Sequence, residues 1–384
     1  MRKPRLMTPG PAPVPEEVLL ELARPVIHHR SAEAKEVITE VVAGLKEVFQ
    51  TKNDVLILTA SGTGAMEAAV VNTIPRGAKA LVLQAGVFSA RWAAICKAYG
   101  IDAVKLDTEW GQAVDPAHVA NALGQHPDTV CVLGTLCETS TGTSHPIDEI
   151  GKVVAKTPAV FAVDGISGVG AMECRTDLWG VDLLCVGSQK ALMLPPGLAF
   201  VAVSPKAWTK INAQESPAFY FNLKAARKKM EEFDTPFTPA HTLILALRAS
   251  LRRILAEGIE NVLKRHRRMS EACLAGVRAL GLELFSSRPA EGLTVFRVPE
   301  GLKDTEIRKR LVERFGLTTI GGQEKLKGQI IRIGHLGYVD ELDVISSLAA
   351  LEMVLSELGL EIEPGCALTA AQEVLIGQKE LSVP

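Results

Sequence analysis

Short apolar runs alternate with stretches of helical periodicity over the first half of the chain. The runs span residues 55–58, 80–83, 129–133, 159–163, 181–186 and 198–203. Nearly continuous apolar strands of this length are typical of a sheet that is buried on both faces, and the helices between them connect parallel neighbours. The pattern therefore predicts an α/β fold with a mostly parallel sheet covered by helices.

The pattern differs at the two ends of the chain. Prolines at positions 9, 11, 13 and 15 predict an extended arm, and a helical pattern follows from residue 16 to about residue 49. Beyond about residue 240, helical patterns at 241–268, 303–315 and 339–358 are mixed with short apolar runs at 281–285, 293–297 and 329–333. We therefore predict an N-terminal arm at 1–15, a large α/β domain at 16–257 and a smaller C-terminal α+β domain at 258–384.

Composition and charge narrow the class of protein. Apolar residues make up 47% of the chain, and the net charge of -2 gives no electrostatic reason to expect nucleic acid or an anionic membrane as a partner. The seven cysteines are scattered and form no C-x-x-C pair, so neither a disulfide framework nor a metal site is expected. We expect a cytosolic protein without a membrane helix or a signal peptide.

A group suited to binding an anion follows the first apolar run. Ser61-Gly-Thr-Gly64 begins a predicted helix, where glycines let the backbone approach a ligand and unpaired N–H groups favour negative charge. The hydroxyls of Ser61 and Thr63 add two donors. This segment predicts a phosphate site, although an ordinary turn with a helix N-cap has the same composition.

Three further polar residues follow or interrupt apolar runs. Asp164 either forms a turn or presents a carboxylate to a protonated ring nitrogen, and Lys190 is either a surface residue or the amine of a Schiff base. Arg332 lies between apolar neighbours. Burying its charged guanidinium group there is energetically unfavourable unless the group is paired, for example with a carboxylate. Together with the phosphate site, these groups predict an enzyme that uses pyridoxal phosphate on an amino acid.

These residues resemble the class V aminotransferases of pyridoxal-phosphate fold type I, in particular the alanine–glyoxylate and serine–pyruvate aminotransferase group. The resemblance rests on motifs spread over most of the chain, namely Thr8-Pro-Gly-Pro11, His28-His-Arg-Ser31, Ser61-Gly-Thr-Gly64, Glu138-Thr-Ser-Thr-Gly142, Val163-Asp-Gly165, Gly187-Ser-Gln-Lys-Ala-Leu192, Pro195-Pro-Gly197 and Arg332-Ile-Gly334. It implies a large domain with a mostly parallel sheet of the seven-stranded type and a smaller α+β C-terminal domain.

The resemblance also implies roles for individual residues. Lys190 would form the Schiff base with pyridoxal phosphate and move a proton, while Asp164 would hold the pyridine nitrogen. The other implied cofactor contacts come from Ser61, Gly62, Thr63 and Gln189 at the phosphate, Phe88 and Ile166 on the two ring faces, Thr139 near the ring hydroxyl, Thr235, and Thr238 from a neighbouring subunit. Arg332 would clamp the substrate carboxylate near the backbone of Gly10.

Some positions depart from the pattern of certain relatives, which carry Trp at Phe88, His at Thr63 and Tyr at Thr235. Gln189 disfavours a cysteine desulfurase, because those enzymes usually carry His before the lysine. The alternatives are a transaminase for 2-aminoethylphosphonate or ureidoglycine, a desulfurase-like lyase, and a non-catalytic partner subunit. His28, His29 and Arg30 are interpreted either as tuning substrate choice at the entrance or as a structural loop.

The function predicted from these residues is a ping-pong transamination from alanine or serine to glyoxylate or pyruvate. Arg332 is the single carboxylate clamp in the set, which favours a monocarboxylic donor over aspartate or glutamate. Because Thr238 would reach the site of a neighbouring subunit, we expect a homodimer with shared active sites.

Overall fold

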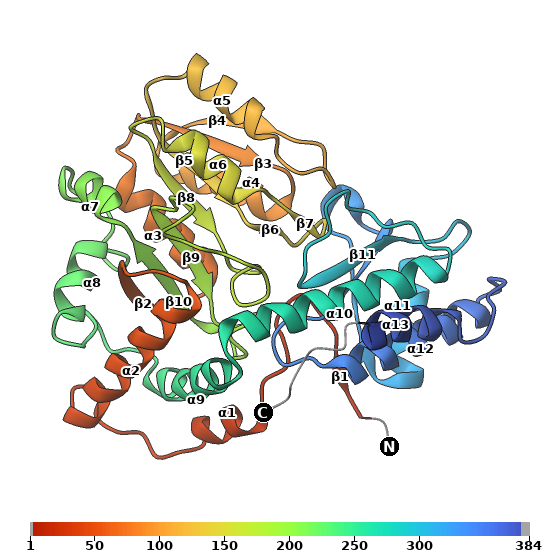
Figure 1. Ribbon diagram of the computed structural model, residues 1–384. Helices are drawn as coiled ribbons and strands as arrows, with labels where there is room; N and C mark the ends of the chain where they lie inside the picture. Colours follow the sequence, from red (N-terminus) through yellow and green to blue (C-terminus); the bar gives the residue numbers. More distant parts are fainter. Residues whose placement is uncertain (1–2, 378–384) are drawn as a thin grey trace.

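The computed structural model describes residues 3–377, and a seven-stranded sheet forms the centre of its larger part (Figure 1). The strands are β2 (Asp54–Ala60), β3 (Lys79–Gln84), β4 (Asp102–Asp107), β5 (Thr129–Thr135), β8 (Val160–Asp164), β9 (Leu183–Gly187) and β10 (Gly197–Val203), in the order β2-β10-β9-β8-β5-β3-β4. Only β10 runs antiparallel to its neighbours in this sheet. The predicted mostly parallel α/β fold is confirmed.

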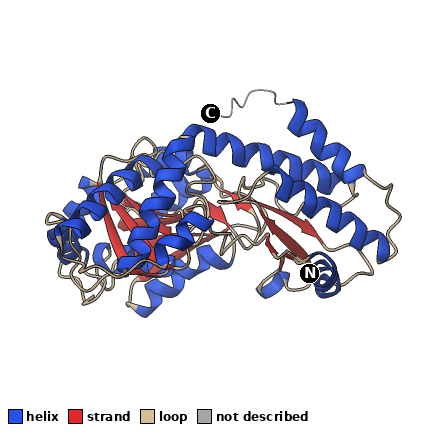
Figure 2. Cartoon of the chain, turned by 90° about the horizontal axis from the view of Figure 1, so that it is seen from below, coloured by secondary structure: helices blue, strands red, loops and turns tan. Residues whose placement is uncertain are grey.

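Helices cover both faces of this sheet (Figure 2). They are α2 (Ala32–Val48), α3 (Gly62–Thr73), α4 (Val87–Ala98), α5 (Pro116–Gln125), α6 (Ile147–Val154), α7 (Pro205–Asn212), α8 (Leu223–Met230) and α9 (His241–Glu257). In β8, Val160 and Ala162 pack in one core with α3 and α4, whereas Phe161 and Val163 pack in the other core with α2 and α9. Because successive side chains of a strand point to opposite faces, this double burial explains the continuous apolar runs.

The C-terminal part is built around a smaller, antiparallel sheet. Strands β11 (Leu293–Arg297) and β13 (Ile320–Gly321) flank β14 (Ile330–Gly334), and the helices beside them are α10 (Ile259–Ala279), α11 (Asp304–Phe315), α12 (Glu341–Glu357) and α13 (Cys366–Gly377). Gly258 separates α9 from α10 with a φ of 84°, at the predicted boundary between the two domains. The boundary itself stays a prediction, and residues 1–2 and 378–384 of the predicted arm and small domain lie outside the described residues.

Several predicted elements were wrong in detail. The helical pattern from 16 to about 49 forms two helices, α1 (Glu16–Leu22) and α2, because Pro25 has no N–H to continue a helix and Ser31 caps α2 through the Ala34 N–H at 3.1 Å. The pattern at 241–268 is likewise divided at Gly258. The run at 281–285 forms a single bridge from Leu284 to Phe296 instead of a strand, and α13 was not predicted.

The N-terminal arm is attached to the C-terminal part. Strand β1 (Arg5–Leu6) pairs in parallel with β12 (Leu317–Thr318), and the Gly334 N–H donates to the Met7 carbonyl at 2.9 Å. The remaining short elements are β6 (Cys137–Glu138), β7 (Thr143–Ser144) and the turn of 3-10 helix η1 (Glu324–Leu326). Across the described residues, every helix is too short or too polar to cross a membrane.

Three buried histidines are held in the neutral form. Burial lowers the pKa of His145 to about 4, that of His266 to about 3 and that of His335 to about 4. At His266 the Nε2 atom accepts the Gly337 N–H at 2.9 Å, which requires an unprotonated nitrogen. The unfolded chain would therefore bind protons at these positions more readily than the folded chain.

We expect the stability contributed by these histidines to be complete above pH 6.5 and to be lost as the pH falls toward 4. Lowering the pKa to these values corresponds to roughly 3 kcal/mol for His145 and His335 and roughly 5 kcal/mol for His266. Thermal midpoints measured between pH 8 and pH 4 test this expectation. His266→Gln should flatten the acid limb of the curve, and His118→Gln, at an exposed position, should leave it unchanged.

Candidate active site

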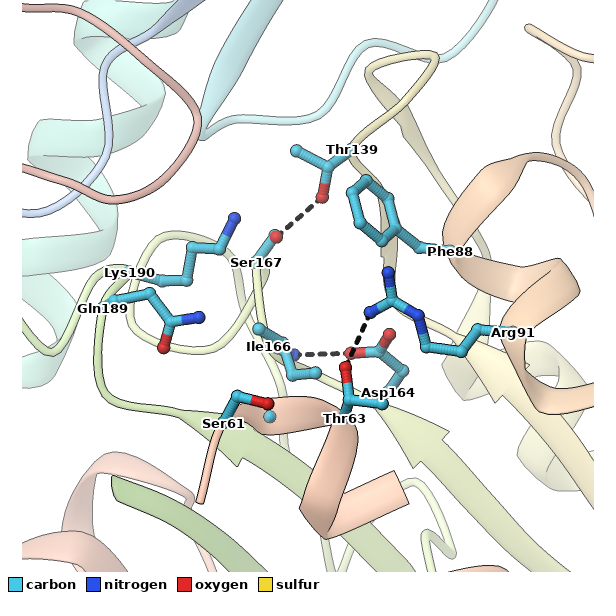
Figure 3. Close-up of a pocket in the computed structure, with 11 residues that line it drawn as sticks. Ser61, Thr63, Phe88, Arg91, Thr139, Asp164, Ile166, Ser167, Gln189 and Lys190 are labelled. Carbon is cyan, nitrogen blue, oxygen red and sulfur yellow. Dashed lines mark hydrogen bonds between the residues drawn. The ribbon is translucent and has the colours of Figure 1, made fainter. Parts of the chain in front are cut away.

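A cavity opens where the parallel strands of the large sheet end (Figure 3). Its lining residues are Ser61, Gly62, Thr63, Phe88, Arg91, Thr139, Asp164, Ile166, Ser167, Gln189 and Lys190. All of these except Arg91 and Ser167 were predicted from the sequence. The fold brings them together because the carboxyl ends of parallel strands meet at one edge of the sheet.

Lys190 follows β9 and projects into the cavity (Figure 3). Its Nζ atom donates a hydrogen bond to the Pro9 carbonyl oxygen at 2.5 Å. Burial lowers the pKa of Lys190 to about 8, and the negative charge of Asp164 acts in the opposite direction. A larger fraction of Lys190 is therefore an uncharged, nucleophilic amine at neutral pH than of an exposed lysine.

The N-terminal arm packs directly against this lysine at Gly10. Gly10 has a φ of 132°, and a Cβ atom there would collide with Lys190 Nζ and lie 2.6 Å from Lys190 Cδ. The Ala12 N–H also donates to the Gln189 carbonyl at 3.0 Å. Only glycine combines this backbone angle with this contact, and the predicted substrate-binding role of Gly10 stays a prediction.

Asp164 is the last residue of β8 and is buried. Its Oδ1 atom accepts the Ile166 N–H at 2.9 Å. Burial raises the pKa of Asp164 to about 7, although the Ile166 N–H and the positive charges of Arg91 and Lys190 oppose this shift. A cation that approached this carboxylate would favour its ionised form, as the protonated nitrogen of a pyridine ring does.

The first turn of α3 provides the predicted anion site. Ser61 is the N-cap residue, and its side chain makes no capping hydrogen bond. A Cβ atom at Gly62 would lie 2.5 Å from Ile166 Cδ1, so glycine is needed for this close packing. The buried amide oxygen of Gln189 has no hydrogen-bond partner within the described chain. The N–H groups of this helix end and the hydroxyls of Ser61 and Thr63 offer donors that fit the phosphate end of pyridoxal phosphate, and Gln189 would turn its NH₂ group, not its amide oxygen, toward that phosphate.

Sequence reasoning missed two lining residues. The Arg91 Nη1 atom donates to Thr63 Oγ1 at 2.9 Å, and its guanidinium carbon lies 5.1 Å from the centroid of the Phe88 ring. The spacing of three residues between Phe88 and Arg91 places both on one face of α4, and this signal was available in the sequence. Ser167 accepts a hydrogen bond from Thr139 Oγ1 at 2.6 Å, a contact between loops that no spacing reveals.

Arg332 lies in the central strand of the small sheet and is buried. Its Nε and Nη2 atoms donate to the Gly321 carbonyl at 3.0 and 2.8 Å, and its Nη1 atom donates to the Thr139 carbonyl at 3.1 Å. Burial lowers the pKa of Arg332 to about 10, so the side chain stays positive at neutral pH. Two of its five N–H groups remain for a further acceptor.

The structure does not bring Thr235 and Thr238 into the cavity of their own chain. Both line a second hollow near the end of β2, where Thr235 Oγ1 donates to the Phe237 carbonyl at 2.6 Å. Beside this hollow, Arg30 forms an ion pair with Asp234 at 3.1 Å. The predicted cofactor contacts of Thr235 and Thr238 stay predictions, the latter through a neighbouring subunit.

Comparisons with known proteins show the family to which the chain belongs. The family model of class V aminotransferases matches residues 8–333. The small subunit of a soluble hydrogenase from Synechococcus is 42% identical over 97% of this chain and 98% of its own length. The L-aspartate–glyoxylate aminotransferase of Paracoccus denitrificans is 38% identical over 96% and 95%, and the serine–glyoxylate aminotransferase of Hyphomicrobium methylovorum is 36% identical over 96% and 94%.

A solved structure gives the same result. The ureidoglycine–glyoxylate aminotransferase of Bacillus subtilis superposes with a TM-score of 0.91 at 31% identity, over 98% of this chain and 99% of its own. The chain belongs to the class V aminotransferases, as its motifs predicted. It is therefore a transaminase with the fold of the type I pyridoxal-phosphate enzymes, and pyridoxal phosphate is its cofactor.

We expect Gly10→Ala to lower turnover by roughly 100-fold, the scale for moving a reacting group by about 1 Å, because the new methyl group would displace Lys190. Steady-state rates and borohydride fixation of the cofactor measure the effect. Gly77→Ala is the matched control, since Gly77 also has a positive φ, of 78°, but has open space around its Cβ position. Equal losses in both variants would show that backbone strain, and not Lys190, is responsible.

Proposed function

We propose that this transaminase moves the amino group of alanine or serine to glyoxylate or pyruvate. The observation that carries the proposal is the convergence of Lys190, Asp164 and the first turn of α3 on one cavity, with Arg332 attached to its wall through the Thr139 carbonyl. The names of the glyoxylate-dependent relatives support glyoxylate as the acceptor.

The proposed division of labour follows from the positions of the side chains. Ser61, Thr63 and the N–H groups of α3 would hold the phosphate, and Asp164 would bind the ring nitrogen and keep it protonated. When bound, pyridoxal phosphate supplies an electron sink for the negative charge that develops at the substrate Cα. The amine of Lys190, with its lowered pKa, would take up and return the Cα proton.

The donor is proposed to carry one carboxylate. Arg332 has two N–H groups left, which suits a single bidentate carboxylate. Arg91, the arginine among the residues that line the cavity, already donates to Thr63 and lies over the Phe88 ring, and Lys190 is assigned to the cofactor. A second carboxylate on the substrate would therefore lose water without gaining a paired cation, which is unfavourable.

A donor panel tests this proposal. With glyoxylate and with pyruvate as acceptors, we expect alanine or serine to give a kcat/KM at least about tenfold above that of aspartate, because the second carboxylate of aspartate stays unpaired. Ureidoglycine and 2-aminoethylphosphonate complete the panel, the former because of the similar Bacillus subtilis structure. Lys190→Ala should give no turnover with any donor. Preference for aspartate would contradict the assignment of a single clamp.

We also propose a homodimer with shared active sites. Thr238 lies beside an exposed aromatic cluster formed by Phe219, Tyr220 and Phe237, in which Phe219 is 83% exposed and Tyr220 stacks on Phe237 at 5.1 Å between centroids. Exposed apolar patches of this kind mark interaction surfaces.

A cytosolic location is proposed as well, and it is supported by the seven cysteines, all of which are free.

Mixing Lys190→Ala subunits with Thr238→Val subunits tests the shared site. In a mixed dimer, one of the two sites would contain both Lys190 and Thr238, whereas neither parent homodimer has a complete site. Random reassortment should therefore restore about a quarter of the wild-type rate. Activity no higher than the average of the parents would contradict the exchange of Thr238 between subunits, and light scattering reports the dimer independently.

A further inference from the structure

Glu138 is a buried carboxylate that the roles above leave unused. Its side chain has no measurable exposure, and none of the ion pairs in the described part of the chain includes it. A buried carboxylate without a cation is costly unless several donors satisfy it. The Glu138 carboxylate accepts from four N–H and O–H groups, two in the first turn of α4 and two in Ser140.

The carboxylate of Glu138 caps this helix. Its Oε2 atom accepts the Ser89 N–H at 2.8 Å, and its Oε1 atom accepts the Phe88 N–H at 3.2 Å. Ser140 completes the cap, because its hydroxyl donates to Glu138 Oε1 at 2.5 Å and accepts the Val87 N–H at 3.1 Å. Three successive N–H groups that a helix leaves without partners are thus paired, and the negative charge lies at the positive end of the helix dipole.

The packing around this cap leaves little freedom. A Cβ atom at Gly86 would collide with the carboxylate of Glu138 and lie 2.6 Å from Ser140 Oγ, so the turn before α4 is pressed against β6. Further along the helix, the Trp92 Nε1 atom donates to the Gly134 carbonyl at 3.0 Å. Helix α4 is therefore anchored at two points, and Phe88 and Arg91 lie between them and project into the cavity (Figure 3).

Glu138 is also connected to the substrate side of the site. The next residue along the chain, Thr139, uses its carbonyl to accept from Arg332 and its hydroxyl to donate to Ser167. The turn that carries Thr139 is fixed by the N–H groups of Thr141 and Gly142, both of which donate to the Glu138 carbonyl. One residue thus links the helix that carries Phe88 to the loop that supports Arg332.

From these contacts we propose that Glu138 is a positioning residue of the active site. By capping α4, it fixes the Phe88 ring against the bound cofactor and sets the position of Arg91. This inference rests on the proposed function and on the stacking role that the family resemblance implies for Phe88. Glu138 does not touch the cavity itself, so its effect passes through α4.

Glu138→Gln is the sharpest test, because the amide has the same shape but offers one acceptor atom where the carboxylate has two. One of the α4 N–H groups would face an NH₂ group and stay unpaired. We expect the apoenzyme to bind pyridoxal phosphate about tenfold more weakly, measured by fluorescence titration. We also expect the circular dichroism band of the bound cofactor to weaken, since the ring would be held less rigidly.

The chain offers a matched control in Glu352. This residue caps another helix, α13, through hydrogen bonds from the Gly365 and Ala367 N–H groups at 2.6 and 3.1 Å, and it lies outside the cavity. Glu352→Gln should lower the thermal midpoint to a similar extent but leave cofactor affinity and dichroism unchanged. Wild-type affinity and dichroism in Glu138→Gln, or equal changes in both variants, would overturn the proposal.

Two further variants separate the possible failures. Ser140→Ala removes only the hydroxyl relay to Val87, so it should weaken cofactor binding in the same direction by a smaller factor, and it serves if Glu138→Gln does not fold. Phe88→Ala tests the stacking role directly. If Phe88→Ala weakens binding and neither cap variant does, Glu138 has no positioning role. If Phe88→Ala has no effect, the stacking role fails and this route from Glu138 to the cofactor fails with it.

Discussion

Because the central strands of the large sheet are buried between two helical layers, polar side chains reach the ligand only where these strands end. This constraint sets the position of nearly every group in the site. Asp164 ends β8, Lys190 lies shortly after β9, and the first turn of α3 directly follows β2. The two apolar cores therefore do more than stabilise the fold, since they hold the reactive groups at one edge of the sheet.

The cavity itself is a poor environment for isolated charges. Burial lowers the pKa of Lys190 and raises that of Asp164, so each group is displaced toward its neutral form. Their mutual attraction opposes both shifts without cancelling them. A bound protonated ring nitrogen would pair with the Asp164 carboxylate, and a bound phosphate would pair with the N–H groups at the start of α3. This pairing is a physical reason for the protein to bind the cofactor. The same property leaves the amine of Lys190 able to exchange protons near neutral pH.

The N-terminal arm and the small sheet close the site from the side opposite the large sheet. The arm pairs with β12 and places the Pro9 carbonyl and Gly10 on Lys190, while Arg332 reaches the Thr139 carbonyl from β14. The cofactor lysine and the proposed substrate clamp are thus both held by the C-terminal part of the chain and by the arm attached to it. A movement of that part would change both sets of contacts at once.

The sequence by itself determined the fold class and most of the cavity lining. Continuous apolar runs specify a doubly buried sheet, and residues such as Asp164 and Lys190 are recognisable because they directly follow those runs. The local breaks at Pro25 and Gly258 were also present in the sequence, but a periodic pattern continued across them and concealed the helix ends. The connection of β1 to β12 could not be predicted, because each strand has only two residues and carries no pattern of its own.

Only the tertiary structure decided which groups act together across distant segments. Arg91 belongs to the site because α4 packs beside α3, and Glu138 caps α4 because β6 lies against the turn before it. Neither the contact of Arg91 with Thr63 nor that of Glu138 with Ser89 has a local sequence signal, because the partners lie 28 and 49 residues apart along the chain. The chain determines its strands and its reactive residues through local patterns, whereas their orientation and charge depend on contacts that exist only after the layers have packed.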